Sequence, residues 1–485
     1  MQNIKTRILV NTIFFFLVYA VMFYVSARAI KMPITHDEAY SFYNVKHFWW
    51  VEALCTGNTH WFNFLAIKAC VIFGFEKGSQ LRWFTLLSSG IFLTVVYFWI
   101  KSIRDVSLKF FAFSITVLNP FVIDYLSLAR GYSTALMFEV LAIICYYLAI
   151  KNRMKNTAML ALFFSGMAAI ANFNFFYFFT AFCVIYFYHF YFKQGFNFLR
   201  NRNFYLECIF VLGIISLVVK ALQFITVCSN DIGAYGAEDL VGGIFVGVIE
   251  TFIYTDFNVS EGTLYIIAFV FCLFVFMAAL FGLRTSIKQP IHWYRSASAI
   301  FLIMMALCVF NKWCFGVLYP TYRTALMFYP LIAMVLVGFF NAILIGKKNR
   351  QWILLPITLF ITVHFLMNLS LRKSFDYWQQ SDTKTCFILL DSLGAKKVGI
   401  APELFGVYRN YYQLTECYGF EFEGESVNTM LPNGMDDSQA LRSFDYLVLL
   451  PPYNLSFYKN NHVILKGEKY YEGTGTLMVK VLPGK

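Results

Sequence analysis

The chain has 485 residues, of which 59% are hydrophobic and only 14% are charged. A soluble protein of this size could not bury so much apolar surface, so the composition excludes a soluble globular protein and predicts a polytopic membrane protein. The net charge of +12 is typical of basic cytoplasmic loops rather than of a nucleic-acid partner.

Apolar runs long enough to cross about 30 Å of hydrocarbon recur along the chain, and only helices satisfy their own backbone at this length. The first run follows basic residues and has no small-residue cleavage site, so we interpret it as a retained span. Asn172 and Asn174 mark the expected turn within residues 157–192. About eleven spans are predicted, near 8–30, 81–100, 108–128, 132–150, 157–173, 174–192, 204–226, 262–283, 296–311, 324–345 and 352–371.

Basic residues group at every second connection between these spans, as at Lys101/Arg104 and Lys347/Lys348. The positive-inside rule places such connections in the cytoplasm, so the connections between them are extracytoplasmic. Residues 227–261 agree, because they carry six acidic residues and no Lys or Arg. The long loop 31–80 and the tail after residue 372 are predicted on the same outer side.

Two outer segments have the pattern of amphipathic helices that lie along the membrane surface. The first is the loop 31–80, which contains the aromatic-rich runs 47–51 and 61–67. The second is the stretch 240–257. Both are therefore expected to be helical.

The tail, residues 373–485, changes in character from the transmembrane domain, residues 1–372. Its apolar runs shorten to strand length, and Gly, Pro and Asn punctuate the rest, which predicts a small α/β or α+β extracytoplasmic domain. Cys386 and Cys417 lie in an oxidising space, where their pairing is left open. Strands are expected at 397–401, 446–450, 462–465 and 477–481, and helices at 382–393 and 402–413.

Acidic and basic side chains both gather at the predicted outer ends of the spans. Directly after the first span, residues 35–40 include His36, Asp37 and Glu38. Each charge alone would fit an anchor or a structural ion pair, but charges at membrane depth usually face the bundle interior or a cavity. Their gathering at one side indicates a shared pocket. The other polar groups on this side are Asn58, Thr59, His60, Asp124, Arg130, Lys220, Lys312, Tyr322 and Arg323.

This set of acidic and basic side chains suits one kind of reaction. Arg and Lys bind phosphate, and a carboxylate can take a proton from an acceptor. Phosphate binding together with proton abstraction at the outer membrane face suggests group transfer from a lipid-phosphate donor.

Four short motifs in order carry a family resemblance. They are residues 35–40 after the first span, 58–65 before the next, Asn119-Pro120 followed by 129–132, and Tyr322-Arg323 followed by Pro330. Through roughly residues 1–350, the chain resembles C-type (GT-C) glycosyltransferases, in the branch of protein O-mannosyltransferases and the aminoarabinose transferase of lipid A. Relatives often have His-Pro-Pro at the second motif, whereas here no Pro follows His60.

The resemblance implies a GT-C-like fold and a polyprenyl-phosphate sugar donor. It makes Asp37 the catalytic base, with Glu38 as its supporting neighbour. A divalent cation is an open alternative, with Asp37, Glu38, His36 or His60 as ligands. The expected donor phosphate-binding residues are Arg130, Tyr132, Lys220, Tyr322 and Arg323, and the other pocket candidates are His36, His60 and Asp124.

The expected function is transfer of a sugar, with inversion, to an extracytoplasmic glycan, lipid or protein at a bacterial inner membrane. A polytopic transporter or flippase of lipid-linked sugars is the alternative. Such proteins often show internal repeats and mid-membrane sites, whereas the charges here lie near one face and no convincing repeat is present. A scaffold with a partner-binding tail would leave the clustering of charges unexplained.

Overall fold

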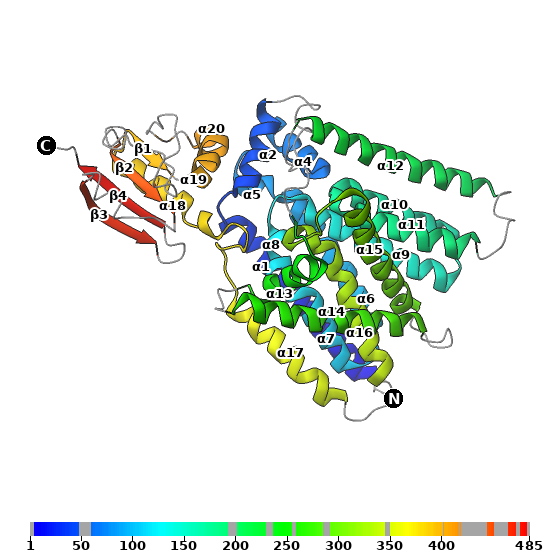
Figure 1. The fold of residues 1–485 in the computed structure, drawn as a ribbon. Coiled ribbons are helices and arrows are strands. Elements are labelled where there is room, and N and C mark those ends of the chain that lie inside the picture. Colours follow the sequence, from blue (N-terminus) through cyan, green and yellow to red (C-terminus); the bar gives the residue numbers. More distant parts are fainter. Residues whose placement is uncertain are drawn as a thin grey trace. The chain divides into compact units, whose positions relative to one another are not determined.

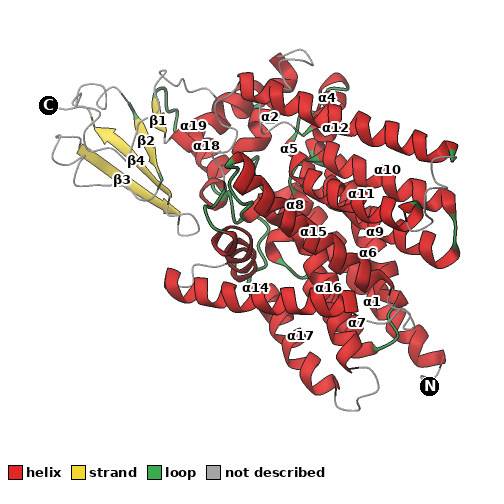
Figure 2. Ribbon diagram, turned by 45° about the vertical axis from the view of Figure 1, so that its right-hand side comes forward, coloured by secondary structure: helices red, strands yellow, loops and turns green. Residues whose placement is uncertain are grey.

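The structure is a computed structural model, shown in Figure 1, that divides into two compact units. The first unit comprises Met1–Ser26, Val51–Leu65 and Arg82–Leu369, and the second comprises Ala27–Trp50, Ala66–Leu81 and Ser370–Lys485. Figure 2 shows that helices dominate the chain and that the strands belong to the tail. The residues that the structure describes are 4–47, 60–192, 201–228, 236–254, 259–284, 292–344, 350–400, 402–416, 418, 444–450, 464–471 and 476–482.

The multi-pass helical architecture is confirmed. Among the described residues, eight helical segments are long and apolar enough to cross a membrane, or nine if a bent pair counts as one span. Two shorter apolar helices, α10 (Lys155–Ala171) and α17 (Arg350–Met367), fall on the remaining predicted runs, so the number eleven stays a prediction. The eight segments are α1 (Ile4–Lys31), α6 (Trp83–Ser102), α9 (Gly131–Asn152), α11 (Phe176–Phe190) with its preceding turn, α12 (Arg202–Cys228), α14 (Glu261–Arg284), α15 (His292–Phe315), and η4 (Tyr322–Phe328) with α16 (Tyr329–Leu344).

The predicted span 108–128 is a bent pair of helices. Helix α7 (Val106–Val117) and helix α8 (Pro120–Ser127) meet at an angle of 56°. The bend has a local cause at Asn119, which precedes α8, and at Pro120, which begins it. Pro120 has no N–H to continue α7, and the Asn119 side chain accepts a hydrogen bond from the Phe121 N–H at 2.8 Å, which starts a new helix.

The predicted turn within 157–192 is confirmed. Helix α10 ends at Ala171, and the Asn172 side chain accepts from the Asn174 N–H at 3.0 Å. The short turn η1 (Phe173–Phe175) then leads into α11. Asparagine therefore stops one helix and caps the next, as its local hydrogen-bonding chemistry favours.

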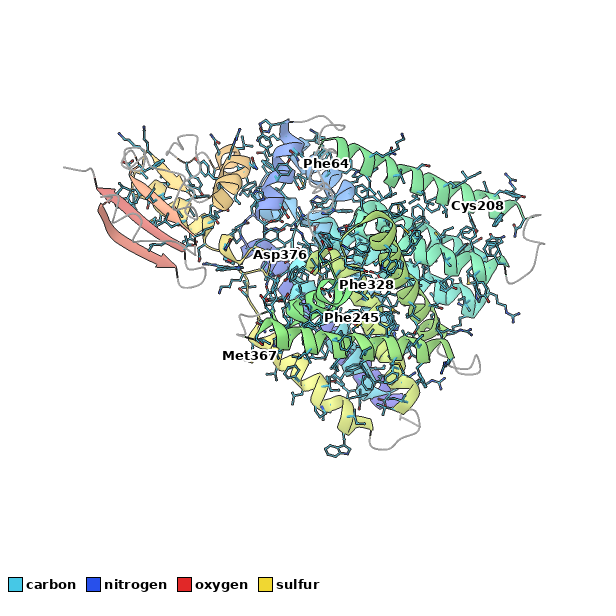
Figure 3. The ribbon with its side chains drawn as sticks, viewed as in Figure 1. Phe64, Cys208, Phe245, Phe328, Met367 and Asp376 are labelled. Atoms are coloured by element: carbon cyan, nitrogen blue, oxygen red, sulfur yellow. The ribbon has the colours of Figure 1, made fainter. Side chains whose placement is uncertain are left out.

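Aromatic side chains fill the first unit and also cover its outer surface. Phe245 and Phe328, labelled in Figure 3, are 0% exposed. Helices α12 and α17 instead leave many large apolar side chains exposed, as expected for surfaces that face lipid rather than water. The helices α7, α14, α16 and α17 lie side by side in Figures 1 and 2.

Both outer segments contain the expected helices. The loop 31–80 contains α2 (His36–His47), α4 (Trp61–Ile72) and α5 (Gly78–Leu81). Residues 48–51 of the first aromatic run lie outside the described residues. The second segment forms η3 (Val241–Val246) and α13 (Gly247–Ile253).

A strand overlaps each of the four predicted tail segments, of which residues 401, 462 and 463 lie outside the described residues. The four strands form one mixed sheet. The strand order is β1-β2-β4-β3, with β1 parallel to β2 and the other two pairings antiparallel. The expected helices are also found. Cys386 is buried in α18, whereas Cys417 lies outside the described residues, so their pairing stays open. The elements are η5 (Trp378–Gln380), α18 (Thr383–Ser392), β1 (Val398–Ile400), α19 (Pro402–Val407), η6 (Tyr408–Tyr412), α20 (Gln413–Thr415), β2 (Tyr446–Leu449), β3 (Ile464–Tyr471) and β4 (Thr476–Leu482).

Candidate active site

The acidic motif forms the start of helix α2 through a capping box. The Glu38 N–H donates to the Thr35 hydroxyl oxygen at 3.4 Å, and the Glu38 carboxylate accepts from the Thr35 N–H and hydroxyl, each at 3.1 Å. This reciprocal pattern satisfies main-chain groups that a helix start otherwise leaves unpaired. Glu38 is only 1% exposed, so its carboxylate is part of the local fold.

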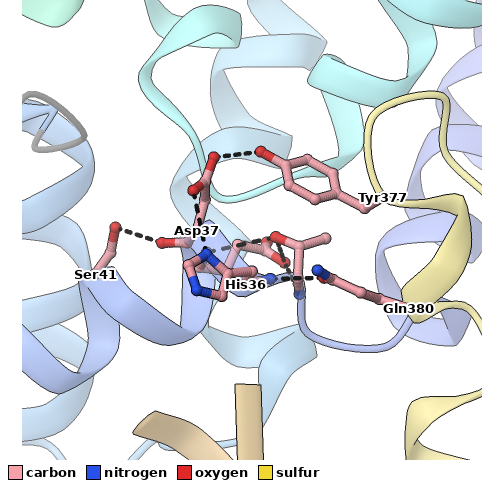
Figure 4. A network of polar contacts seen from close by, with 7 residues as sticks. His36, Asp37, Ser41, Tyr377 and Gln380 are labelled. Carbon is pink, nitrogen blue, oxygen red and sulfur yellow. Dashed lines mark hydrogen bonds and ion pairs between the residues drawn. The ribbon is translucent and has the colours of Figure 1, made fainter. Parts of the chain in front are cut away.

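Asp37 presents a buried carboxylate in the first turn of α2, where the helix dipole favours negative charge. The residue is 5% exposed. The Tyr377 hydroxyl donates a hydrogen bond to Asp37 Oδ2, and His36 Nδ1 lies 3.7 Å from Asp37 Oδ1. Figure 4 shows the phenol directed at the carboxylate. Asp37 is therefore held in one orientation by a residue distant in sequence.

The segment that follows helix α17, residues 370–382, contacts the end of α1 and the start of α2. Gln380 Oε1 accepts from the His36 N–H at 2.7 Å (Figure 4). The buried Arg28 guanidinium donates to the Ser370 carbonyl oxygen at 2.5 Å and also to that of Lys373. We call residues 370–382 the connector.

The tail also packs directly on α2. A Cβ atom placed on Gly406 would lie 2.7 Å from His36 Nε2, so α19 approaches the imidazole closely. Phe42 and Tyr411 meet edge to face with ring centroids 5.2 Å apart, and the Tyr411 hydroxyl donates to the Glu76 carbonyl oxygen at 2.9 Å. The acidic motif is thus built into the second compact unit together with the tail.

In the first unit, the second and third sequence motifs lie against each other. The His60 and Tyr132 rings have centroids 5.3 Å apart, and the Asn63 amide donates to the Ala129 carbonyl oxygen at 2.5 Å. Gly131 is required here, because a Cβ atom would lie 2.3 Å from the Ala171 carbonyl oxygen. Asn58 and Thr59 lie outside the described residues.

The third motif carries two fully buried charged residues. Asp124 on α8 and Arg130 before α9 are each 1% exposed. Both Asp124 carboxylate oxygens accept from the Tyr254 hydroxyl, at 2.9 and 3.0 Å. Tyr254 ends α13 with a positive φ of 61°, an uncommon conformation for a bulky residue. The outer segment 241–254 is therefore tied to α8.

The Tyr322-Arg323 motif begins η4 in a strained conformation. Tyr322 has a φ of 45°, and the side chains of Thr321 and Thr324 form a capping box around it. Helix α13 packs closely on this turn, because a Cβ atom on Gly247 would lie 2.7 Å from the Tyr322 nitrogen. Arg323 itself is half-buried.

The remaining predicted cations differ from these buried residues. Lys220 is exposed on α12, and Lys312 forms an ion pair with Glu238. The structure therefore groups His36, Asp37 and Glu38 in the second unit. It groups His60 with Tyr132, Asp124 with Tyr254, and Tyr322-Arg323 with Gly247 in the first.

Sequence reasoning missed several residues that hold these groups. Tyr377, Gln380 and Tyr254 lie far along the chain from their partners, and no local pattern indicates the contacts. The capping box could be predicted from the sequence, because Thr35 and Glu38 have the Thr-x-x-Glu spacing that starts many helices.

No group of three or more His, Cys, Asp or Glu side chains suited to hold a metal ion occurs among the described residues. Of the four suggested ligands, Glu38 is engaged in the capping box and Asp37 accepts from Tyr377. A divalent cation at these residues stays a prediction.

Two crystal structures of ArnT from Cupriavidus metallidurans share the architecture of this chain. The apo structure has a TM-score of 0.51 at 11% identity and covers 96% of this chain and 98% of its own. The structure bound to undecaprenyl phosphate has a TM-score of 0.52 at 11% identity and covers 96% and 97%. This chain has the GT-C fold. No family model and no curated protein matches its sequence.

The predicted resemblance is confirmed for the fold by a match that extends over the transmembrane helices and the tail alike. At this identity, the two structures share with the chain an arrangement of elements rather than a set of side chains. The comparison therefore shows the fold and assigns no role to an individual residue.

Proposed function

We propose that the chain is a membrane glycosyltransferase that moves a sugar from a polyprenyl-phosphate donor to an extracytoplasmic glycan, lipid or protein. One observation carries the proposal: the fold is shared over 96% of the chain with an ArnT structure bound to undecaprenyl phosphate. The buried acidic motif supports it, because a carboxylate held at the start of a helix can serve as a base.

Asp37 is the proposed general base. Its carboxylate takes the proton from an acceptor hydroxyl or amine while that group attacks the anomeric carbon. The bond between that carbon and the donor phosphate oxygen breaks, and the lipid phosphate leaves as an anion. A single displacement of this kind inverts the anomeric centre, and the base contributes typically about 10²–10⁴-fold in rate.

Cationic and phenolic groups stabilise the leaving phosphate in this proposal. The anomeric carbon gains oxocarbenium character as the phosphate departs, so charge develops on both partners. Donors already directed at the leaving oxygen lower the barrier, usually by the largest single contribution. The residues assigned to this role are Arg130, Tyr132, Lys220, Tyr322 and Arg323.

The experiment uses the full chain in detergent with two probes. Undecaprenyl phosphate alone measures binding through a shift in unfolding temperature. A panel of undecaprenyl-phosphate-linked hexoses and pentoses, supplied with total cell-envelope extract, measures transfer through release of undecaprenyl phosphate. We expect Asp37→Asn to keep binding and to lower transfer by about 10²–10⁴-fold, because only the base is lost.

The matched control is Asp105→Asn. Asp105 also lies at a helix start, where its side chain accepts from the Leu108 N–H at 2.9 Å, but it precedes α7 on the predicted cytoplasmic side. This variant should transfer sugar normally. Unchanged transfer by the Asp37→Asn variant would remove Asp37 from the role of base, and no transfer by the unmodified chain would overturn the enzyme proposal itself.

A flippase of lipid-linked sugars is the second candidate, because the bent pair α7 and α8 is the kind of broken helix that transporters use. Proteoliposomes distinguish the two proposals. A flippase moves an undecaprenyl-phosphate-linked sugar across the bilayer without consuming it, whereas the proposed enzyme releases undecaprenyl phosphate.

A further inference from the structure

We propose that Tyr377 is the positioning residue that holds the Asp37 carboxylate for proton abstraction, so that the connector belongs to the active site. This inference rests on the proposed function. Tyr377 lies in the connector, near the start of the tail, and it is only 8% exposed. Its hydroxyl donates to Asp37 Oδ2 (Figure 4).

The geometry suits a positioning role because the phenol engages one of the two carboxylate oxygens. His36 Nδ1 lies 3.7 Å from the other oxygen, which is beyond hydrogen-bond distance. The hydrogen bond to Oδ2 therefore fixes the orientation of the carboxylate group. It also sets the direction in which Oδ1 points. A base must lie within hydrogen-bond reach of the proton that it removes.

The connector that carries Tyr377 is attached to the rest of the second unit on both sides of this residue. On one side, Arg28 binds the carbonyl oxygens of Ser370 and Lys373. On the other side, Gln380 accepts the N–H of His36, the residue next to the base. Tyr377 is therefore placed with respect to α2 by contacts independent of its own hydroxyl, and removal of that hydroxyl should leave the connector attached.

A purely structural role makes a different prediction. A phenol that only satisfies a buried carboxylate would stabilise the fold without selectively changing the chemical step. A positioning residue loses its kinetic effect once the base is gone, because residues that act as a unit are not additive. The two roles therefore differ in a double variant.

The test compares Tyr377→Phe with Tyr411→Phe in the full chain. Each change removes one hydroxyl from a buried tyrosine of the second unit, but the Tyr411 hydroxyl donates to the Glu76 carbonyl oxygen. We expect Tyr377→Phe to lower kcat for undecaprenyl phosphate release by about 10–100-fold with donor KM changed less than about threefold, because a misplaced group costs on the order of 10²-fold. Tyr411→Phe should leave kcat unchanged.

The double variant decides between the roles. In the Asp37→Asn background, Tyr377→Phe should cause no further loss of kcat. An equal loss in both backgrounds, or an unchanged kcat in the single variant, would overturn the inference while the enzyme proposal stands. Failure of the unmodified chain to release undecaprenyl phosphate would instead overturn the proposed function.

A second measurement covers the case in which Tyr377→Phe fails to fold. Site-specific 3-fluorotyrosine at position 377 keeps the ring and the hydroxyl but strengthens the hydroxyl as a donor. A stronger donor makes the carboxylate less basic, so kcat should fall by about two- to fivefold. An unchanged kcat would overturn the positioning role.

Discussion

Two adjacent carboxylates in the acidic motif have different surroundings. Asp37 accepts from a phenol that reaches it from the connector, whereas Glu38 accepts from the main chain and hydroxyl of Thr35. The first contact orients a carboxylate toward chemistry, and the second completes a helix start. We therefore expect the support that Glu38 gives to the site to be structural.

This difference predicts the effect of two substitutions at position 38. Glu38→Gln keeps an oxygen that can accept in the capping box, since Gln occupies this position in capping boxes as well. It should retain most of the transfer activity. Glu38→Ala should lower the free energy of unfolding by about 1 kcal/mol, as loss of a cap does. Transfer rates and thermal unfolding in detergent measure the two effects.

Asp37→Asn is the reference for this comparison. A Glu38→Gln variant that loses as much transfer as Asp37→Asn would show that the charge of Glu38, and not its capping contact, is required. A Glu38→Ala variant of unchanged stability would show that the capping box contributes little.

At the scale of elements, the outer helix α13 supports the Tyr322-Arg323 turn. Gly247 lets the helix backbone approach the Tyr322 nitrogen, and Ala237 and Tyr319 exchange main-chain hydrogen bonds at 3.0 and 2.9 Å beside it. Strained residues such as Tyr322 persist only where their surroundings hold them. The outer segment therefore determines the backbone from which Arg323 extends.

Gly247→Ala should consequently weaken binding of undecaprenyl phosphate. The added methyl group must displace the Tyr322 backbone, because the available distance is 2.7 Å, and the proposed phosphate ligand Arg323 follows directly. We expect a loss of about tenfold or more in affinity, comparable to one misplaced charged hydrogen bond. The shift in unfolding temperature with added undecaprenyl phosphate measures it.

Gly213→Ala is the matched control. Gly213 lies within α12, and nothing lies within 4 Å of an added Cβ atom there. Binding should be unchanged, and stability should be unchanged or slightly higher, because Ala favours a helix over Gly by roughly 0.5–1 kcal/mol. Equal affinity of the two variants would argue against the supporting role of α13.

At the scale of the whole molecule, the tail shares a compact unit with the acidic motif. Residues 27–50 and 66–81 group with 370–485, and Tyr377 and Gln380 contact the start of α2 directly. Deleting the tail would therefore remove part of the proposed active site. Loss of function after such a deletion would fit an enzyme as well as a scaffold.

The predicted orientation in the membrane can be checked with a native cysteine. Cys314 is exposed and lies at the end of α15, in the predicted outer connection before Tyr322. A membrane-impermeant maleimide should label it in intact spheroplasts, and Cys314→Ser should lack this label. Lys151→Cys, in a predicted cytoplasmic connection, should react only after the membrane is permeabilised. The reverse pattern would invert the topology.

The sequence by itself determined the helical membrane architecture, the strands of the tail and the acidic motif. These features depend on local properties: the length of apolar runs, the spacing of strand residues, and charges placed beside a span. The turn at Asn172 could be predicted for the same reason, since an asparagine side chain forms hydrogen bonds with the neighbouring backbone.

Only the tertiary structure decided what holds the candidate site residues. The hydrogen bonds from Tyr377 to Asp37 and from Tyr254 to Asp124 join residues 340 and 130 positions apart. Such contacts leave no periodic pattern in a chain, because they arise only when distant segments pack together. The sequence indicated which carboxylate to consider, and the fold showed which phenol orients it.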